Sequence, residues 1–177
     1  MQFYDISRDV LTTQPYGDDP AVTTTVLSSI ENGDVCNVTQ ISMSAHQATL
    51  IDAPEHFDDD GKDIGALRLA PFYGKCTVVT IDGYLTGEDM EELLPHCKKR
   101  IIFHGRGNAY LTASAAQVIA QSSVVLVGTD ANSIATPYDE MRPHLELARA
   151  NIAVLENLNL EGVKDGVYTL CAFPVKL

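Results

Sequence analysis

Residues 42–57 read Ser-Met-Ser-Ala-His-Gln-Ala-Thr-Leu-Ile-Asp-Ala-Pro-Glu-His-Phe, and no other stretch of the chain is as informative. It places His46, Asp52 and His56 close together in the sequence. In an extended segment alternate side chains share a face, so these three would lie on one side, subject to a kink at Pro54. Imidazole and carboxylate ligands suit zinc, manganese or iron. The segment therefore indicates half of a metal site, and three polar residues on a hydrated loop are the alternative.

A second segment, residues 144–160, carries His144 on a predicted helix and Glu156 at the end of an apolar strand. A carboxylate that loses its water there without a partner is strongly destabilising. A metal ion or a cationic side chain would offset that cost. Alternatively, Glu156 sits at the mouth of the strand and faces water.

In the rest of the chain, the sequence of the first half indicates hairpins, and that of the second half indicates strands that alternate with helices. Two β-prone runs flank Asn32-Gly33, which favours a hairpin with a type I′ turn. Residues 8–21 are typical of a loop. The pattern predicts a single α/β domain over residues 1–177 with a mixed sheet. We expect strands at 3–7, 22–30, 35–44, 76–81, 100–103, 124–127, 152–155 and 166–175, and helices at 86–94, 112–120 and 137–150.

The two segments together resemble the cyclase family, which includes bacterial arylformamidases (kynurenine formamidases) and isatin hydrolases. Its signature runs Ser-x-His-x-Gly-Thr-His-x-Asp-x-Pro-x-His-Phe, followed late in the chain by His-x-x-Leu and Glu-Asn-Leu. Residues 4–7, 15–20 and 127–130 also resemble the family, so the likeness covers nearly the whole chain. The matching positions are Ser44, His46, Thr49, Asp52, Pro54, His56, Phe57, His144, Leu147, Glu156, Asn157 and Leu158.

This resemblance implies a swivelling β/β/α-type domain, with a mixed, barrel-like sheet flanked by helices. It implies a metal-dependent hydrolase of a small amide, formamide or lactone. A divalent metal, zinc or manganese, would hold the attacking water, and His56 would act as general acid or base. By the same resemblance the metal-ligand positions are His46, Asp52, His144 and Glu156.

Two positions depart from the family signature. Leu50 stands where the family has its second histidine, and Ala48 stands where it has glycine. Leucine cannot ligate a metal, which argues against a two-metal site and leaves open a catalytically degenerate protein that binds a ligand or partner without turnover. His104 is a candidate replacement ligand, although an ordinary loop histidine after a strand is the simpler interpretation.

The resemblance also carries expectations about assembly. Family members usually continue into one more strand carrying an arginine, whereas this chain ends at Leu177. We therefore expect a sheet edge that is open, short, or covered by another subunit. Since family members usually form dimers or tetramers, we expect a homo-oligomer.

The amino-acid composition limits the classes of molecule that the chain is expected to bind. With 12 basic and 24 acidic residues the net charge is −12, which makes nucleic acid and anionic lipid poor partners and leaves a small-molecule substrate. No apolar run approaches the ~20 residues that span a bilayer. The N-terminus lacks the basic flank and apolar core of a signal peptide, and four scattered cysteines without CxxC spacing fit reduced thiols. We therefore expect a cytoplasmic protein.

Overall fold

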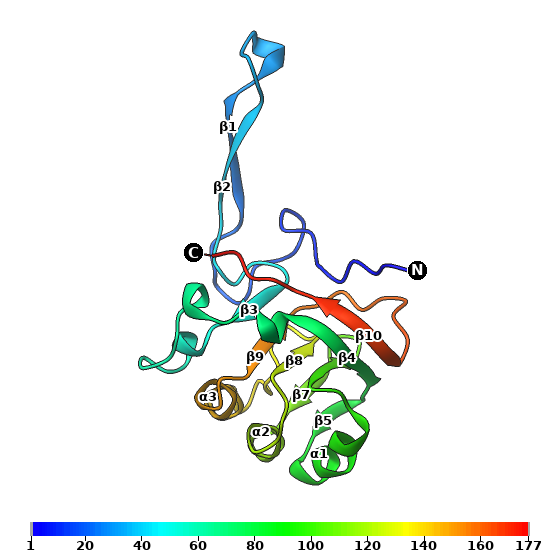
Figure 1. Ribbon diagram of the computed structural model, residues 1–177. Helices are drawn as coiled ribbons and strands as arrows, with labels where there is room; N and C mark the ends of the chain where they lie inside the picture. Colours follow the sequence, from blue (N-terminus) through cyan, green and yellow to red (C-terminus); the bar gives the residue numbers. More distant parts are fainter. Residues whose placement is uncertain (1, 177) are drawn as a thin grey trace.

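A six-stranded mixed sheet forms the centre of the computed structural model, which describes residues 2–176 (Figure 1). The strand order is β10-β4-β6-β8-β9-β3. The four inner strands run parallel, and the two edge strands are antiparallel to their neighbours. The α/β class with a mixed sheet flanked by helices is confirmed. The strands are β3 (Leu50–Asp52), β4 (Tyr73–Thr80), β6 (Arg100–His104), β8 (Leu126–Thr129), β9 (Ala153–Glu156) and β10 (Gly166–Cys171).

Three helices lie next to one another along one side of the sheet: α1 (Gly87–Leu93), α2 (Ala113–Ala120) and α3 (Met141–Arg149) (Figure 1). The first two begin where the sequence predicts. Thr86 accepts a hydrogen bond from the Asp89 backbone N–H, and the Asp89 carboxylate accepts one from the Thr86 N–H. Thr112 caps α2 through the Ala115 N–H. Such side-chain caps replace the partners that the first turn of a helix lacks.

Apolar side chains cover both faces of the inner strands. Ile101, Phe103 and Val127 face the helices, whereas Ile102 and Leu126 face a second cluster beneath the loops that follow β9. Parallel strands are normally buried on both sides, as here. The strand that ends at Glu156 therefore carries a carboxylate into the interior of the protein.

The first hairpin stands apart from this body. Strands β1 (Thr23–Ser28) and β2 (Val38–Ser42) form their own two-stranded sheet and project away from it (Figure 1). The predicted hairpin is confirmed, but its predicted type I′ turn is wrong, because that turn needs positive φ at both central residues. Only Gly33 has it, with φ 94°. A 3-10 turn at Ile30–Asn32 fills a longer loop, which the Asp34 carboxylate closes by accepting from the Ser29 N–H at 2.7 Å.

Among the other differences from prediction, three are the largest. The strand expected at 3–7 is wrong: this segment is irregular and is fastened by the Asn159 N–H, which donates to the Ile6 carbonyl at 2.9 Å. Helix α3 begins at 141 rather than 137, because residues 136–139 close a turn of their own. The last strand stops at 171 rather than 175.

Two very short strands were not predicted from the sequence. These are β5 (Gly83–Leu85) and β7 (Ala109–Leu111), which form a small parallel pair, whereas β3 agrees with the extended conformation considered for residues 42–57. Segments of three residues are too short to show a hydrophobic period. In the part of the chain that the structure describes, no helix has the length and apolar character needed to cross a bilayer.

Candidate metal centre

Strands β3 and β9 bring the two segments together. They pair antiparallel, with Leu50 opposite Glu156 and Asp52 opposite Val154. A 3-10 turn at Pro54–His56 follows β3 directly, and α3 precedes β9. Side chains that are about a hundred residues apart in sequence therefore meet at one edge of the sheet.

Hydrogen bonds fix this junction. The Thr49 hydroxyl donates to the Asn157 carbonyl at 2.8 Å and accepts from the Arg8 backbone N–H at 2.9 Å. The Asn157 amide donates to the Ala48 carbonyl at 3.1 Å, and the Arg8 guanidinium donates to the Asn157 carbonyl at 3.0 Å. Ala48 and Asn157 both adopt positive φ, 58° and 56°, so the backbone kinks on each side of the junction. The family's glycine at position 48 would meet this conformation with less strain.

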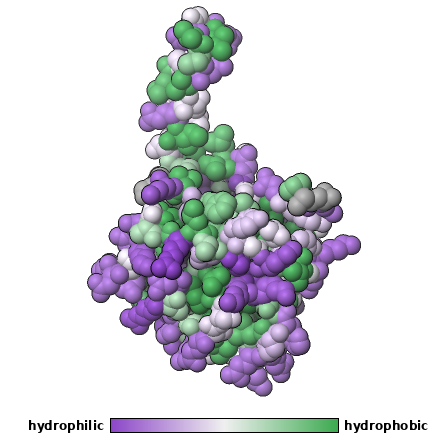
Figure 2. Space-filling model, viewed as in Figure 1, coloured by the Kyte–Doolittle hydropathy of each residue, from purple (hydrophilic) through white to green (hydrophobic). Residues whose placement is uncertain are grey.

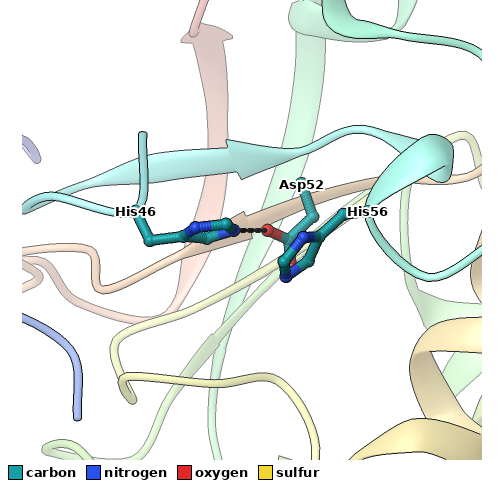
Figure 3. Close-up of side chains that lie close together, drawn as sticks. All are labelled: His46, Asp52 and His56. Carbon is teal, nitrogen blue, oxygen red and sulfur yellow. Dashed lines mark ion pairs between the residues drawn. The ribbon is translucent and has the colours of Figure 1, made fainter. Parts of the chain in front are cut away.

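The first cluster is formed by His46, Asp52 and His56, whose side chains converge (Figure 3). The His46 Nε2 lies 3.7 Å from the Asp52 Oδ1, and the rings of His46 and His56 are 4.1 Å apart between centroids. One ligand atom from each residue lies within 4.8 Å of the others. The Asp52 Oδ1 is buried and has no hydrogen-bond partner among residues 2–176. A buried carboxylate oxygen without a donor is destabilising unless a cation meets it.

The second cluster is formed by Asp52, His144 and Glu156, all buried. The His144 Nε2 lies 3.0 Å from the Glu156 Oε1 and 3.5 Å from the Asp52 Oδ2. Its Nδ1 donates to the Glu140 carbonyl at 2.7 Å, which leaves Nε2 as the nitrogen that faces the carboxylates. Phe57 stacks on the His144 ring with centroids 4.1 Å apart. Asp52 therefore contributes one oxygen to each cluster.

Without a metal ion, a proton must balance these carboxylates. Burial lowers the pKa of His144, but hydrogen bonds to Asp52 and Glu156 outweigh that effect and raise the pKa to about 10. Burial, and then the charge of Asp52, raises the pKa of Glu156 to about 7. The cluster thus stabilises positive charge at the point where the His144 Nε2 faces two carboxylates.

These donors fit a divalent metal. Imidazole nitrogen and carboxylate oxygen are the ligand types of catalytic zinc and manganese sites. The Nδ1–H of His144 is already bound to a carbonyl, which fixes the ring as metal-ligating histidines usually are fixed. The unpaired Asp52 Oδ1 supplies an acceptor that no protein donor in the described residues uses.

Comparison with known sequences shows the family to which the chain belongs. A profile described as "Putative cyclase" matches residues 4–136. The kynurenine formamidase of Bacillus anthracis is 31% identical over 99% of this chain and 91% of its own length. That of Delftia acidovorans is 30% identical over the same shares. The chain belongs to the cyclase family.

Solved structures agree with the fold of this cyclase-family chain. A predicted metal-dependent hydrolase from Bacillus stearothermophilus superimposes with a TM-score of 0.79 at 22% identity, covering 98% of this chain and 90% of that one. Isatin hydrolase A from Labrenzia aggregata superimposes with a TM-score of 0.80 at 19% identity, covering 98% and 87%. At these sequence identities the structural similarity shows a shared fold and nothing more.

The pocket that contains these two clusters also shows the departure of this chain from the family signature. Leu50 lies in the lining with Asp52, as the two-residue period of an extended strand predicts. An apolar side chain thus occupies the position of the missing histidine. The pocket has a cavity of about 180 Å³ and is lined by Tyr16, Asp19, His46, Leu50, Asp52, His56, Phe57, Asn132, Glu140, His144 and Glu156.

His104 is not part of this lining. Its Nε2 lies 3.5 Å from the Asp130 Oδ2. The Asp130 carboxylate in turn accepts from the backbone N–H groups of residues 105, 106 and 107, so it organises the turn that follows β6. His104 is the last residue of β6 rather than a loop residue after the strand, and its ring lies at this turn.

Sequence reasoning did not identify four polar residues of the lining: Tyr16, Asp19, Asn132 and Glu140. The Tyr16 hydroxyl donates to the Glu140 Oε1 at 2.5 Å, which fastens the loop before β1 to the start of α3. That hydrogen bond raises the pKa of Tyr16. No spacing in the sequence links two residues so far apart, so only the folded chain reveals the pair.

Proposed function

We propose that this chain is a metal-dependent hydrolase that acts on a small amide, formamide or lactone. The observation that carries the proposal is the Asp52 carboxylate, shared by two clusters of potential ligands and left with an unpaired buried oxygen. The kynurenine formamidase and isatin hydrolase relatives support the substrate class.

The proposed ligands are His46, Asp52, His144 and Glu156, and zinc and manganese suit them equally. A divalent ion held there would polarise a carbonyl oxygen and lower the pKa of a coordinated water toward ~7. The protein contributes the fixed orientation of its ligands. The Glu140 carbonyl holds the His144 ring, and the pairing of β3 with β9 places Asp52.

His56 is the proposed general acid or base. It lies at the exposed rim beside His46, and partial burial lowers its pKa, opposed by the charge of Asp52. A lowered pKa keeps the imidazole neutral at neutral pH, so it can accept a proton from the attacking water. The same group can then return the proton to the leaving nitrogen or oxygen. Phe57 and Leu50 add apolar walls against which the carbon skeleton of a substrate can pack.

Leu50 favours a second candidate function. If the apolar side chain in the lining prevents productive metal binding, the chain is a catalytically degenerate member that binds a ligand or partner without turnover. This alternative predicts well below one ion per chain after purification and no hydrolysis with added metal.

The test is hydrolysis of an aryl formamide, an isatin-type cyclic amide and a simple lactone by the purified protein. We expect activity with zinc or manganese, its loss on chelation and its return when metal is added back. A protein that holds well below one ion per chain and hydrolyses none of the three with added metal supports the second candidate.

The role of His56 has a separate test. In His56→Ala we expect turnover to fall by about 10²-fold or more, in line with the usual contribution of a general acid or base, while bound metal stays at the wild-type level. Full activity would rule out the proposed role. Loss of the ion together with activity would assign His56 to the metal instead.

We also propose that the chain forms a homo-oligomer, a dimer or tetramer, in the cytoplasm. Family resemblance supports the assembly, and the net charge of −12 argues against nucleic acid and anionic lipid as partners.

A further inference from the structure

The lining of the pocket contains more acidic side chains than the proposed metal site uses. Two of its carboxylates, Asp52 and Glu156, are buried and belong to the clusters of potential ligands. Two others, Asp19 and Glu140, belong to neither cluster. Among the described residues that line the pocket there is no lysine and no arginine. Asp19 and Glu140 therefore add negative charge that the metal ligands do not account for.

Hydrogen bonds hold these two carboxylates in place without cancelling their charge. The Glu140 Oε1 accepts from the Tyr16 hydroxyl, and the Asp19 Oδ2 accepts from the Ser44 hydroxyl, each at 2.5 Å. Both donors are neutral hydroxyl groups. Neither carboxylate forms an ion pair with a basic side chain within residues 2–176. Each carboxylate therefore keeps its charge and a second oxygen with which it can bind a ligand.

The surroundings of Glu140 favour its ionised form. It lies at the N-terminus of α3, where the helix dipole stabilises a negative charge. Its hydrogen bond to Tyr16, and then burial, raise the pKa of Tyr16, so the phenol stays protonated and remains a donor. Arg142, the nearest arginine in the sequence, pairs with Asp139 at 2.7 Å instead. No arginine of α3 therefore neutralises the Glu140 carboxylate.

The same cavity contains a buried acceptor that independently indicates a positively charged ligand. The Asp52 Oδ1 is buried and has no hydrogen-bond partner within residues 2–176. Glu140 lies close to this group along the chain, because its backbone carbonyl accepts from the Nδ1 of His144 at 2.7 Å. Asp19, Glu140 and Asp52 all line one cavity of about 180 Å³. A small substrate whose carbonyl group lies at the metal ligands would therefore have its other substituents near Asp19 and Glu140.

We infer that Glu140 and Asp19 form a subsite for an ammonium group, so that the pocket selects cationic over anionic substrates. The inference rests on the proposed hydrolase function and narrows its substrate to an amide, formamide or lactone that also carries an amine. A carboxylate binds an ammonium group through charge-assisted hydrogen bonds. The same two carboxylates repel a substrate that carries a carboxylate of its own.

The first test measures kcat/KM of the zinc-loaded protein for three formanilides that share one formamide group. One is unsubstituted, one has a para aminomethyl group and one has a para carboxylate. We expect the wild type to prefer the aminomethyl compound to the carboxylate by at least about tenfold, with the unsubstituted compound between them.

Matched variants locate the origin of this preference. Glu140→Gln keeps an oxygen that accepts from Tyr16 but removes the charge, so the preference should fall by about threefold or more. Asp19→Asn in addition should lower it further. Glu146→Gln, on the same helix but outside the lining, makes the same change in net charge and should keep the wild-type preference.

A second measurement does not depend on turnover. Calorimetric titration of the same proteins with benzylamine and with benzoate gives the ratio of the two dissociation constants. We expect Glu140→Gln to shift this ratio toward benzoate by about threefold or more, and Glu146→Gln to leave it unchanged.

The outcomes distinguish this inference from the hydrolase proposal. If no formanilide is hydrolysed but the titration shows the expected shift, the formamide substrate is wrong and the ammonium subsite is supported. If the formanilides are hydrolysed but the wild type prefers the carboxylate, or Glu140→Gln and Glu146→Gln alter the preference equally, the ammonium subsite alone is overturned. A titration in which Glu140→Gln leaves the ratio unchanged also overturns the subsite, whether or not turnover is observed.

Discussion

At the scale of single residues, one carboxylate organises the candidate site. Asp52 faces His46 and His56 with one oxygen and His144 with the other. Because Asp52 and Glu156 are both buried, their charges need a positive partner. In the absence of metal the proton on His144 is that partner, and a divalent ion would replace it. The chemistry of the site thus depends on competition between a proton and a metal.

That competition predicts how metal binding depends on pH. A ligating imidazole must be neutral, so a bound ion has to displace the proton from His144. The neighbouring carboxylates hold that proton firmly, because they raise the pKa of His144 to about 10. Raising the pH removes the competing proton, so affinity should rise by about tenfold per pH unit for each proton displaced. Below pH 7 the dependence should steepen, because the pKa of Glu156 is about 7.

Calorimetric titration with zinc at pH 8, in buffers of different ionisation enthalpy, counts the released protons. We expect about one proton per ion. Binding without proton release, or an affinity independent of pH between 6 and 8, would show that zinc does not displace a proton from His144.

Position 50 offers a gain-of-function prediction. Its side chain lies in the pocket lining on the strand that carries Asp52. A histidine there adds an imidazole to the cluster, so Leu50→His should tighten zinc binding by more than about tenfold. Leu69→His, at an exposed loop position, is the matched control and should bind zinc as the wild type does. Equal metal content in all three proteins would mean that Leu50 does not limit the site.

At the scale of elements, the junction between β3 and β9 determines whether the two clusters form. Thr49 accepts from Arg8 and donates to Asn157, so one hydroxyl ties three segments together. Thr49→Val keeps the shape but leaves these backbone groups without their partner. We expect a loss of roughly 1–3 kcal/mol in the free energy of unfolding, with weaker metal binding.

Urea unfolding measures the first effect and zinc titration the second. Thr39→Val, on the exposed strand β2, is the control and should change the free energy of unfolding by less than about 0.5 kcal/mol. If Thr49→Val were as stable and as metal-bound as the control, the hydroxyl would not hold the junction.

The elements also show what the sequence can and cannot predict. Helices capped by Thr86 and Thr112 were predictable, because the capping residue and the helix it starts are adjacent. The turn at Asn32-Gly33 was not, because a side chain at Asp34 closes a longer loop. The candidate ligands were predictable from their resemblance to a family signature. Tyr16 and Glu140 were not, since only tertiary folding brings them into contact.

At the scale of the whole molecule, the chain divides into an acidic body that carries the pocket and a projecting hairpin, residues 22–44, whose only charged side chains are Glu31 and Asp34 (Figures 1 and 2). Asp52, His144 and Glu156 are buried in the body, which limits the screening of their charges by water. The hairpin ends beside the pocket, where the Ser44 hydroxyl donates a hydrogen bond to Asp19 of the pocket lining.

The most direct measurement is the metal content of the purified protein, by elemental analysis after incubation with zinc or manganese and removal of excess. We predict about one divalent ion or more per wild-type chain and nearly none in Asp52→Asn, which keeps the shape of the side chain but loses its charge. Asp82→Asn, an exposed position, should retain the wild-type content. A wild-type chain that binds no ion, or an Asp52→Asn chain that binds as much as the wild type, would contradict a metal centre built on residues 46–56, 144 and 156.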